Sequence, residues 1–175
     1  DKNGKVIVEK WIPAKNLKTV ADAILLKDKI VVLSQAGDKD DDYIALNFLN
    51  GIGEEKSTKI ISDKKLRLIP KSIMSIPGGE KMVIAAEAVS RKNPNDSYTV
   101  LIWTDKDGNR QTQKEYLPGV VNKPEYIGRF GDGEMVVTGR VKAENGREAG
   151  WVLRLSQRGD ILYQRPYARG GDSVI

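Results

Sequence analysis

Apolar and polar positions alternate through the stretch from Ala149 to Asp172, and this alternation predicts one β-hairpin. Every second residue from Trp151 to Leu155 is a large apolar residue, as in a strand with one buried face. A polar turn around Gly159 follows, and a second run over residues 161–165 comes back and stops at Pro166. A strand, a Gly-containing turn and a strand ended by proline together indicate a hairpin.

The upstream chain contains earlier copies of this unit. Each copy has a first strand, a tight turn, an apolar second strand, a polar loop, a third strand that starts with an aromatic residue, a further turn and a polar fourth strand. The predicted first strands are 22–26, 72–76 and 126–130, and the second strands are 30–33, 82–85 and 135–138. The predicted third strands are 43–48, 98–103 and 151–155, and the fourth strands are 54–61, 111–117 and 161–165.

The character of each strand predicts its place in the sheet. The second strands are almost wholly apolar, so we expect them to be central strands buried on both faces. The polar fourth strands suit an outer edge, where lysine and glutamate discourage pairing with another chain. Residues 16–26 also fit a helical spacing, but a loop followed by a strand is favoured because the later copies have strands there.

The spacing of the copies decides the fold class. The second strands begin at Ile30, Met82 and Met135, which are 52 and 53 residues apart. Units of four antiparallel strands with a period of about 40 to 55 residues are typical of β-propeller blades. We therefore predict an all-β, partial β-propeller of about three full blades. An up-and-down barrel is the alternative, but it does not require a buried second strand and a polar fourth strand in every copy.

The last unit also resembles a known repeat. Gly150-Trp151, Gly159, Tyr167 and Gly170-Gly171 match the blade repeat of bacterial multi-blade propellers, in which a Gly-Trp strand start, a Gly turn and a Tyr-x-x-Gly-Gly exit recur. The match is good over residues 149–172 and partial over 43–61 and 98–117, where the Gly-Gly exit is missing. The resemblance implies a fold and says little about function, because propellers serve many roles.

The two ends of the chain each match part of a blade. We expect blades at approximately 20–62, 70–117 and 125–167, all within one propeller or propeller segment over residues 1–175. Residues 1–12 and 172–175 would belong to broken flanking blades. Because three blades leave apolar faces open, we expect the ring to be completed by further parts of a longer protein or by a second copy of the chain.

The amino-acid composition excludes several kinds of catalytic and binding chemistry. The 175 residues include no cysteine and no histidine, which removes thiolate chemistry, disulfides and a Ser-His-Asp triad. No apolar run is long enough for a membrane span, and no motif indicates a cofactor or a metal. The net charge is +5, with one cluster of basic residues: Lys56, Lys59, Lys64, Lys65, Arg67 and Lys71. No aromatic residues interleave with the cluster, so it is interpreted as a solvated edge and not as a nucleic-acid site.

Four motifs each have a structural and a functional interpretation. Residues 105–109 resemble the start of a calcium loop, but the downstream glutamate of an EF-hand is missing, and a hairpin turn is favoured. The acidic run at 38–42 is interpreted as a solvated loop, although a hard cation is the alternative. The Arg158-Gly159-Asp160 tripeptide is interpreted as a repeat turn and not as an adhesion motif. The aromatic starts Tyr43, Tyr98 and Trp151 are interpreted as blade packing, with a sugar-binding rim as the alternative.

The loops between second and third strands carry the functional prediction. They span 37–42, 90–96 and 142–148, and they are polar and differ between copies, as expected of a recognition surface on a constant frame. The candidate partner-binding residues are Asp38, Asp40, Asp41, Asp42, Arg91, Lys92, Asn93, Asn95, Asp96, Glu144, Asn145 and Arg147. The predicted function is a non-catalytic scaffold that binds a protein partner. The alternatives are an accessory propeller domain of a hydrolase or lyase whose catalytic residues lie elsewhere, and a carbohydrate-binding propeller.

Overall fold

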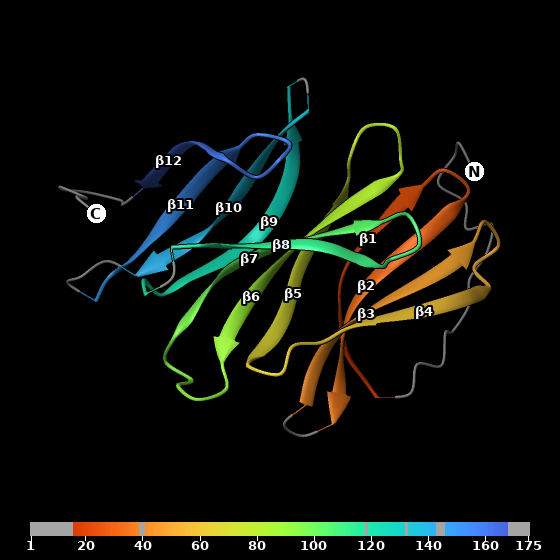
Figure 1. The fold of residues 1–175 in the computed structure, drawn as a ribbon, viewed down its shortest axis with the longest axis horizontal. Coiled ribbons are helices and arrows are strands. Elements are labelled where there is room, and N and C mark those ends of the chain that lie inside the picture. The colour runs from red at the N-terminus through yellow and green to blue at the C-terminus, as the bar shows by residue number, and fades with distance from the viewer. Residues whose placement is uncertain (1–15, 39–40, 118, 132, 143–145, 168–175) are drawn as a thin grey trace, which may run out of the picture.

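The described part of the chain is all β and forms three separate sheets (Figure 1). The computed structural model describes residues 16–38, 41–117, 119–131, 133–142 and 146–167. The first sheet contains β1 (Leu17–Leu26), β2 (Lys29–Asp38), β3 (Asp41–Asn50) and β4 (Glu55–Ile61). The second contains β5 (Leu66–Ser75), β6 (Lys81–Ser90), β7 (Ser97–Asp105) and β8 (Arg110–Tyr116). The third contains β9 (Asn122–Phe130), β10 (Glu134–Lys142), β11 (Glu148–Leu155) and β12 (Ile161–Tyr167).

Each sheet is an antiparallel meander, with its strands side by side in chain order. The sheets stack face against face, as blades of a β-propeller do, and they do not join into one tube. The predicted fold class is therefore confirmed, and so is the strand at the start of the first sheet, where a helix was the alternative. The flanking half-blades predicted at residues 1–12 and 172–175 lie outside the described residues.

The first strands of the blades are longer than predicted. β5 and β9 run through Pro70 and Pro124, which were expected to precede the strands. Both prolines lie beside a β-bulge on an edge strand, where the missing N–H is tolerated. At the second bulge the backbones approach closely, since a Cβ atom on Gly139 would lie 2.1 Å from the Lys123 carbonyl oxygen.

The polar loop predicted at residues 37–42 is shorter in the structure, so the predicted loop length is wrong. Gly37 pairs with Asp42 and Asp38 pairs with Asp41, so β2 and β3 extend almost to the tip of the hairpin. The equivalent connections in the other blades are longer, because β6 ends at Ser90 and β7 begins at Ser97, while β10 ends at Lys142 and β11 begins at Glu148.

The predicted alignment of the third strands also needs correction. Tyr43 pairs with Ala36 and Tyr98 pairs with Ala88, but the residue at this position of the third blade is Ala149, which pairs with Val141. Trp151 therefore aligns with Val100 and not with the tyrosines. Its side chain is 1% exposed and packs between the second and third blades, so the interpretation as a packing residue is confirmed.

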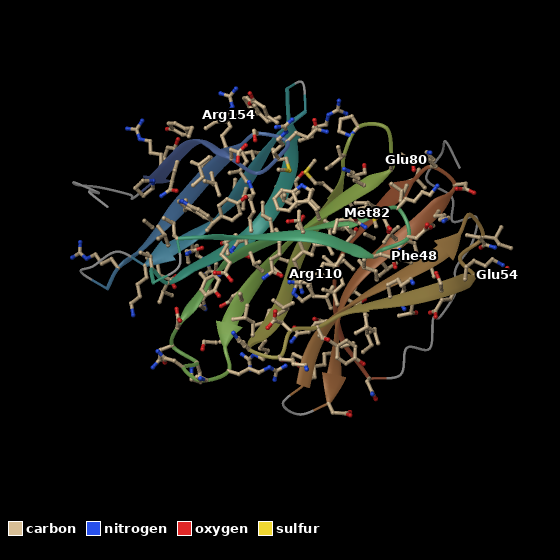
Figure 2. All side chains as sticks on the ribbon, viewed as in Figure 1. Phe48, Glu54, Glu80, Met82, Arg110 and Arg154 are labelled. Atoms are coloured by element: carbon tan, nitrogen blue, oxygen red, sulfur yellow. The ribbon has the colours of Figure 1, made fainter. Side chains whose placement is uncertain are left out.

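The core consists of two layers, one at each interface between blades. Phe48 and Met82 belong to the layer between the first and second blades and lie close together in Figure 2. β6 is the one described second strand that lies between two other blades, and it is buried on both faces as predicted. β2 and β10 alternate between buried and half-buried side chains because each faces a described neighbour on one side only. The expectation of two buried faces is wrong for these two strands.

One turn recurs three times, between the third and fourth strands of each blade. The turns are Asn50–Glu54, Asp105–Asn109 and Ser156–Asp160. In each, the first side chain accepts hydrogen bonds from the backbone N–H groups two and four residues later. The fourth residue is a glycine with a positive φ, 76°, 81° and 80° respectively, which an L side chain adopts only with strain. We call this element the blade turn.

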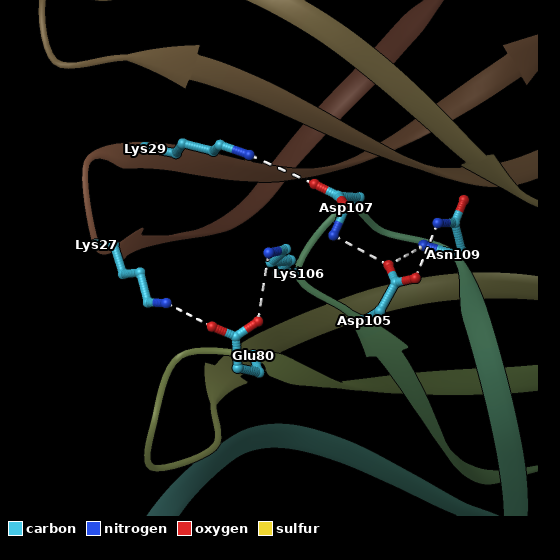
Figure 3. Close-up of polar contacts among 7 residues, drawn as sticks. All are labelled: Lys27, Lys29, Glu80, Asp105, Lys106, Asp107 and Asn109. Carbon is cyan, nitrogen blue, oxygen red and sulfur yellow. Dashed lines mark hydrogen bonds and ion pairs between the residues drawn. The ribbon is translucent and has the colours of Figure 1, made fainter.

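The blade turn joins neighbouring blades. A Cβ atom on Gly108 would lie 3.0 Å from the Phe48 ring of the first blade, and one on Gly159 would lie 2.5 Å from the Trp103 ring of the second. An ion pair also joins the first and second blades. Lys29 Nζ lies 3.4 Å from Asp107 Oδ1, as Figure 3 shows. The second and third blades therefore each rest their blade turn on the forward face of the blade before them, by which we mean the face toward the higher-numbered blade.

Candidate interaction surface

Antiparallel meanders place connections of two kinds at the same edge of the molecule. The hairpins between second and third strands end at one rim, and the links from one blade to the next, which follow β4 and β8, begin there. The blade turns lie at the opposite rim (Figure 1). We call the first edge the recognition rim, because it carries the predicted partner-binding loops.

The loop over residues 91–96 is the best-defined part of this rim. Ser90 N–H donates to the Asp96 carbonyl at 3.0 Å, and Asp96 N–H donates to the Asn93 carbonyl at 3.0 Å. Asn93 N–H donates to Ser90 Oγ, and Asn93 Oδ1 accepts from Asn95 N–H, both at 3.2 Å. These local bonds fix the loop without help from a ligand.

The link between the first two blades lies against this loop. Arg91 N–H donates to the Lys65 carbonyl at 3.0 Å. Asp63 Oδ1 accepts from the N–H groups of Lys65 and Leu66 at 2.8 and 3.1 Å, which shapes the link as an Asx turn. Loop and link together therefore form one polar ridge built from two parts of the chain.

Two pockets open along this ridge. One has a volume of about 310 Å³ and is lined by Arg67, Val89, Ser90, Arg91 and Pro94. The other has a volume of about 360 Å³ and is lined by Lys64, Lys65, Leu66, Ser90, Arg91, Lys92, Asp96 and Tyr98. They share Ser90 and Arg91, so they adjoin. Five cationic side chains and one carboxylate line the pair, so it carries an excess of positive charge, which attracts anionic groups.

Tyr98 forms the apolar wall of the larger pocket and is 7% exposed. Its hydroxyl donates to Glu115 Oε1 at 3.2 Å. Burial, together with the nearby charge of Glu115, raises the pKa of Tyr98 to about 12. The phenol therefore stays protonated near neutral pH and remains a hydrogen-bond donor within the blade.

The first hairpin contributes less than predicted. Asp42 is 5% exposed and forms ion pairs with Lys18 and with Arg67, whose Nε lies 3.6 Å from Asp42 Oδ2. Asp38 is exposed at the end of β2, and Asp41 begins β3. Asp40 lies outside the described residues. The bond between Asp42 and Arg67 links this hairpin to the ridge, so the first two blades bring their candidate residues together.

The third hairpin is further along the same rim. Arg147 is exposed just before β11, and Lys142 N–H donates to the Val121 carbonyl at 2.8 Å. Glu144 and Asn145 lie outside the described residues. The linings of the two pockets include no described residue of this hairpin.

Sequence reasoning missed the part of the site supplied by the link. Lys64, Lys65 and Arg67 were interpreted as a solvated edge, separate from the candidate loops. A signal was present, because a four-stranded antiparallel meander returns its exit to the rim of its second-to-third hairpin. The next blade begins there, so the link could have been assigned to the recognition rim.

The motifs at residues 105–109 and 158–160 are turns, as the structural interpretation of each predicted. Asp105 Oδ1 accepts from the N–H groups of Asp107 and Asn109, as a turn requires. Gly159 packs against Trp103, and Asp160 Oδ1 lies 2.9 Å from Lys114 Nζ, so the Arg-Gly-Asp tripeptide is part of a blade turn docked on the second blade. No group of three or more aspartate or glutamate side chains suited to a metal ion occurs in the described part of the chain.

No helix among the described residues is long and apolar enough to cross a membrane.

Comparison with known proteins supports the fold. No protein-family model and no curated protein sequence matches the chain. Among solved structures, the chain is similar to a subtype N10 neuraminidase-like protein of A/little yellow-shouldered bat/Guatemala/060/2010, with a TM-score of 0.56 and 18% sequence identity. The match covers 83% of this chain and 42% of that one, so this chain spans less than half of its length. At this identity the similarity shows a β-propeller fold and nothing further.

Proposed function

We propose that this propeller segment is a non-catalytic interaction module that binds an acidic segment of a protein partner at the recognition rim. The observation that carries the proposal is the pair of adjoining pockets, in which five cations lie on a ridge fixed by its own hydrogen bonds. An ordered site loses little conformational freedom when it binds, which favours affinity.

The shape and chemistry of the pockets favour a peptide over a small ligand. The pockets are open and share Ser90 and Arg91 in their linings, so an extended segment could contact both. Its carboxylates would pair with Lys64, Lys65, Arg91 and Lys92, and one apolar side chain would rest on the half-buried Leu66. Lysine and arginine at exposed positions give attraction that weakens with salt.

The carbohydrate-binding alternative has less support. It relied on Tyr43, Tyr98 and Trp151 at a rim. Trp151 and Tyr98 are 1% and 7% exposed and pack between blades, whereas Tyr43 is half-buried. The accessory-domain alternative concerns residues outside this chain, and the neuraminidase-like neighbour shares the fold at 18% identity only.

Titration with a glutamate-rich peptide of about ten residues, followed by fluorescence anisotropy, tests the proposal. The double variant Lys64→Glu/Lys92→Glu should weaken binding at least about tenfold, because two attractive contacts become repulsive. The matched control, Lys81→Glu/Lys106→Glu, makes the same change in net charge at two exposed lysines of the opposite rim and should bind like the parent. Equal binding by the double variant and the control would refute the proposed site.

A further inference from the structure

The two interfaces between the described blades are built from equivalent residues. Lys59 of the first blade lies opposite Leu46, and Lys114 of the second blade lies opposite Leu101. Both leucines lie four residues before the first residue of a blade turn, so the two lysines hold the same place on their forward faces. The two interfaces can therefore be compared position by position.

Two polar contacts close the interface between the second and third blades. Asp160, the fifth residue of its blade turn, lies with Oδ1 2.9 Å from Lys114 Nζ. Beside this ion pair, the Tyr116 hydroxyl donates to the Gly159 carbonyl at 2.8 Å. The lysine on this forward face therefore has a carboxylate partner that the next blade supplies.

The interface between the first and second blades lacks both contacts. Asn109 is the fifth residue of its blade turn, so an amide stands where the other interface has the carboxylate of Asp160. Ile61 stands in the place of Tyr116 and has no hydroxyl to donate. Within the described part of the chain, the Lys59 ammonium forms no hydrogen bond or ion pair.

A pocket of about 410 Å³ lies where those contacts are missing. Two cationic side chains line it, Lys59 from β4 and Arg110 from the start of β8, and Ser62 and Asn109 add polar groups. Its lining includes no described aspartate or glutamate. Like Lys59, Arg110 has no hydrogen bond or ion pair with a described residue. The pocket therefore carries two positive charges without a carboxylate in its lining.

Other carboxylates around this blade turn are already paired with lysines, as Figure 3 shows. Asp107 Oδ1 lies 3.4 Å from Lys29 Nζ, and the two oxygens of Glu80 pair with Lys27 and Lys106. Neither acid is part of the pocket lining. These ion pairs leave the two cations of the pocket without a partner from this side.

Asp105 is engaged mainly by its own turn. Its Oδ1 accepts from the N–H groups of Asp107 and Asn109, and its Oδ2 accepts from Asn109 Nδ2 at 2.8 Å. Burial raises the pKa of Asp105, but the hydrogen bonds from Asn109 and Asp107, followed by the charge of Lys59, lower it below its usual value. Asp105 therefore attracts Lys59 less strongly than it holds its turn.

We propose that this pocket between the first and second blades binds a phosphate group. A guanidinium can pair with two phosphate oxygens and an ammonium with a third, so Arg110 and Lys59 together suit a dianion. The bound phosphate would take the place that the Asp160 carboxylate has beside Lys114 in the other interface. The site shares no lining residue with the two pockets of the recognition rim, so the proposal is independent of the proposed function.

Amide chemical shifts, followed by NMR at constant ionic strength, test the proposal. Inorganic phosphate and glycerol phosphate are titrated separately, since a free ion and a monoester present the same group. The amides of residues 108–110 should shift with one midpoint for at least one of the two ligands, and the tighter ligand shows whether the group is taken free or esterified. Acetate, a monoanion, should bind at least about fivefold more weakly because it leaves one cation unpaired.

Replacing one cation should remove most of the affinity. Lys59→Met should weaken phosphate binding at least about tenfold, because a charge-assisted hydrogen bond is lost. Lys114→Met makes the same change at the equivalent position of the other interface, where Asp160 already pairs with the lysine, and should bind phosphate like the parent.

A second variant moves a carboxylate and keeps both cations. Asp105→Ser/Asn109→Asp gives this blade turn the first and fifth residues of the third one, Ser156 and Asp160, without a change in net charge. The carboxylate at position 109 should then pair with Lys59, and phosphate should bind at least about tenfold more weakly.

The amide spectrum of each variant without ligand establishes that it is folded, and if the exchanged turn does not fold, the two methionine variants decide. Binding that Lys59→Met weakens and Lys114→Met keeps supports the proposal. No response at residues 108–110 to either phosphate would overturn it, even if amides at the recognition rim respond. Equal binding by the two methionine variants, undiminished binding by a folded exchanged turn, or acetate binding as tight as phosphate binding would overturn it as well.

Discussion

Gly159 lies against Trp103 so closely that a Cβ atom on the glycine would come within 2.5 Å of Cη2 of the indole ring. The two residues are in different blades, and the Tyr116 hydroxyl donates to the Gly159 carbonyl at 2.8 Å beside them. The blade turn therefore contributes packing and a hydrogen bond to the interface.

Replacing Trp103 by a small residue should strongly lower the stability of the protein. The side chain is 5% exposed and packs between the second and third blades, so Trp103→Ala should lower the free energy of unfolding by about 3 to 5 kcal/mol. Arg154→Ala changes the equivalent position of the third blade, where no described residue of a further blade covers the face, and should cost about 1 kcal/mol or less. Urea unfolding of both variants measures the difference, and equal losses would show that the two faces are not differently covered.

Lys114 should control the titration of Asp160. The hydrogen bond from Lys114, followed by that from Ser156, lowers the pKa of Asp160 below its usual value. Since the pKa is lower in the folded state, the carboxylate contributes stability above its unfolded pKa of about 3.9. That contribution disappears as the pH falls through the folded pKa.

An NMR titration of the side-chain carboxyl carbons measures this effect. The midpoint of Asp160 should lie below about 3.9 in the parent and should rise in Lys114→Met. Lys81→Met, which removes a lysine far from this contact in the sequence, serves as the control and should leave the midpoint unchanged. The same midpoint in the parent and in Lys114→Met would show that the ion pair between blades does not persist in solution.

The side chain of Asn122 should stabilise the link between the second and third blades. It is fully buried, its Nδ2 donates to the Val120 carbonyl at 2.8 Å, and its Oδ1 accepts from Thr99 N–H at 2.8 Å. Asn122→Ala leaves these groups unpaired and should cost about 2 to 4 kcal/mol. Hydrogen exchange at the Thr99 amide should accelerate, while the exposed control Asn93→Ala should leave that amide protected. Unchanged protection in Asn122→Ala would contradict this role.

The strand order and the blade period could be predicted because both depend on local patterns. Apolar runs at Ile30, Met82 and Met135 mark the central strands, and Gly-containing turns separate the hairpins. The starts of β5 and β9 could not be found in this way, because a proline normally ends a strand. Pro70 and Pro124 are accommodated by bulges whose position depends on the neighbouring strand.

The candidate site could be predicted only in part, because it combines distant segments. The polar loop at 91–96 was recognised as a surface, but its pockets need Lys64 and Lys65, which a separate connection places beside Arg91. The sequence likewise shows Asp42 as one of several acids in a row. Its burial follows from Lys18 and Arg67, which only the folded chain brings to it.

The role of the blade turn as the connection between blades is tested most directly by Gly159→Ala, compared with Gly78→Ala. Both glycines have a positive φ, 80° and 94°, so an alanine meets similar backbone strain at each. A Cβ atom at Gly78 meets nothing within 4 Å, whereas one at Gly159 collides with Trp103 and Tyr116. Thermal or urea unfolding should show Gly159→Ala to be about 1 to 3 kcal/mol less stable than Gly78→Ala, which is the usual cost of overpacking a filled site. Equal stability of the two variants would contradict the contact between the turn and the preceding blade.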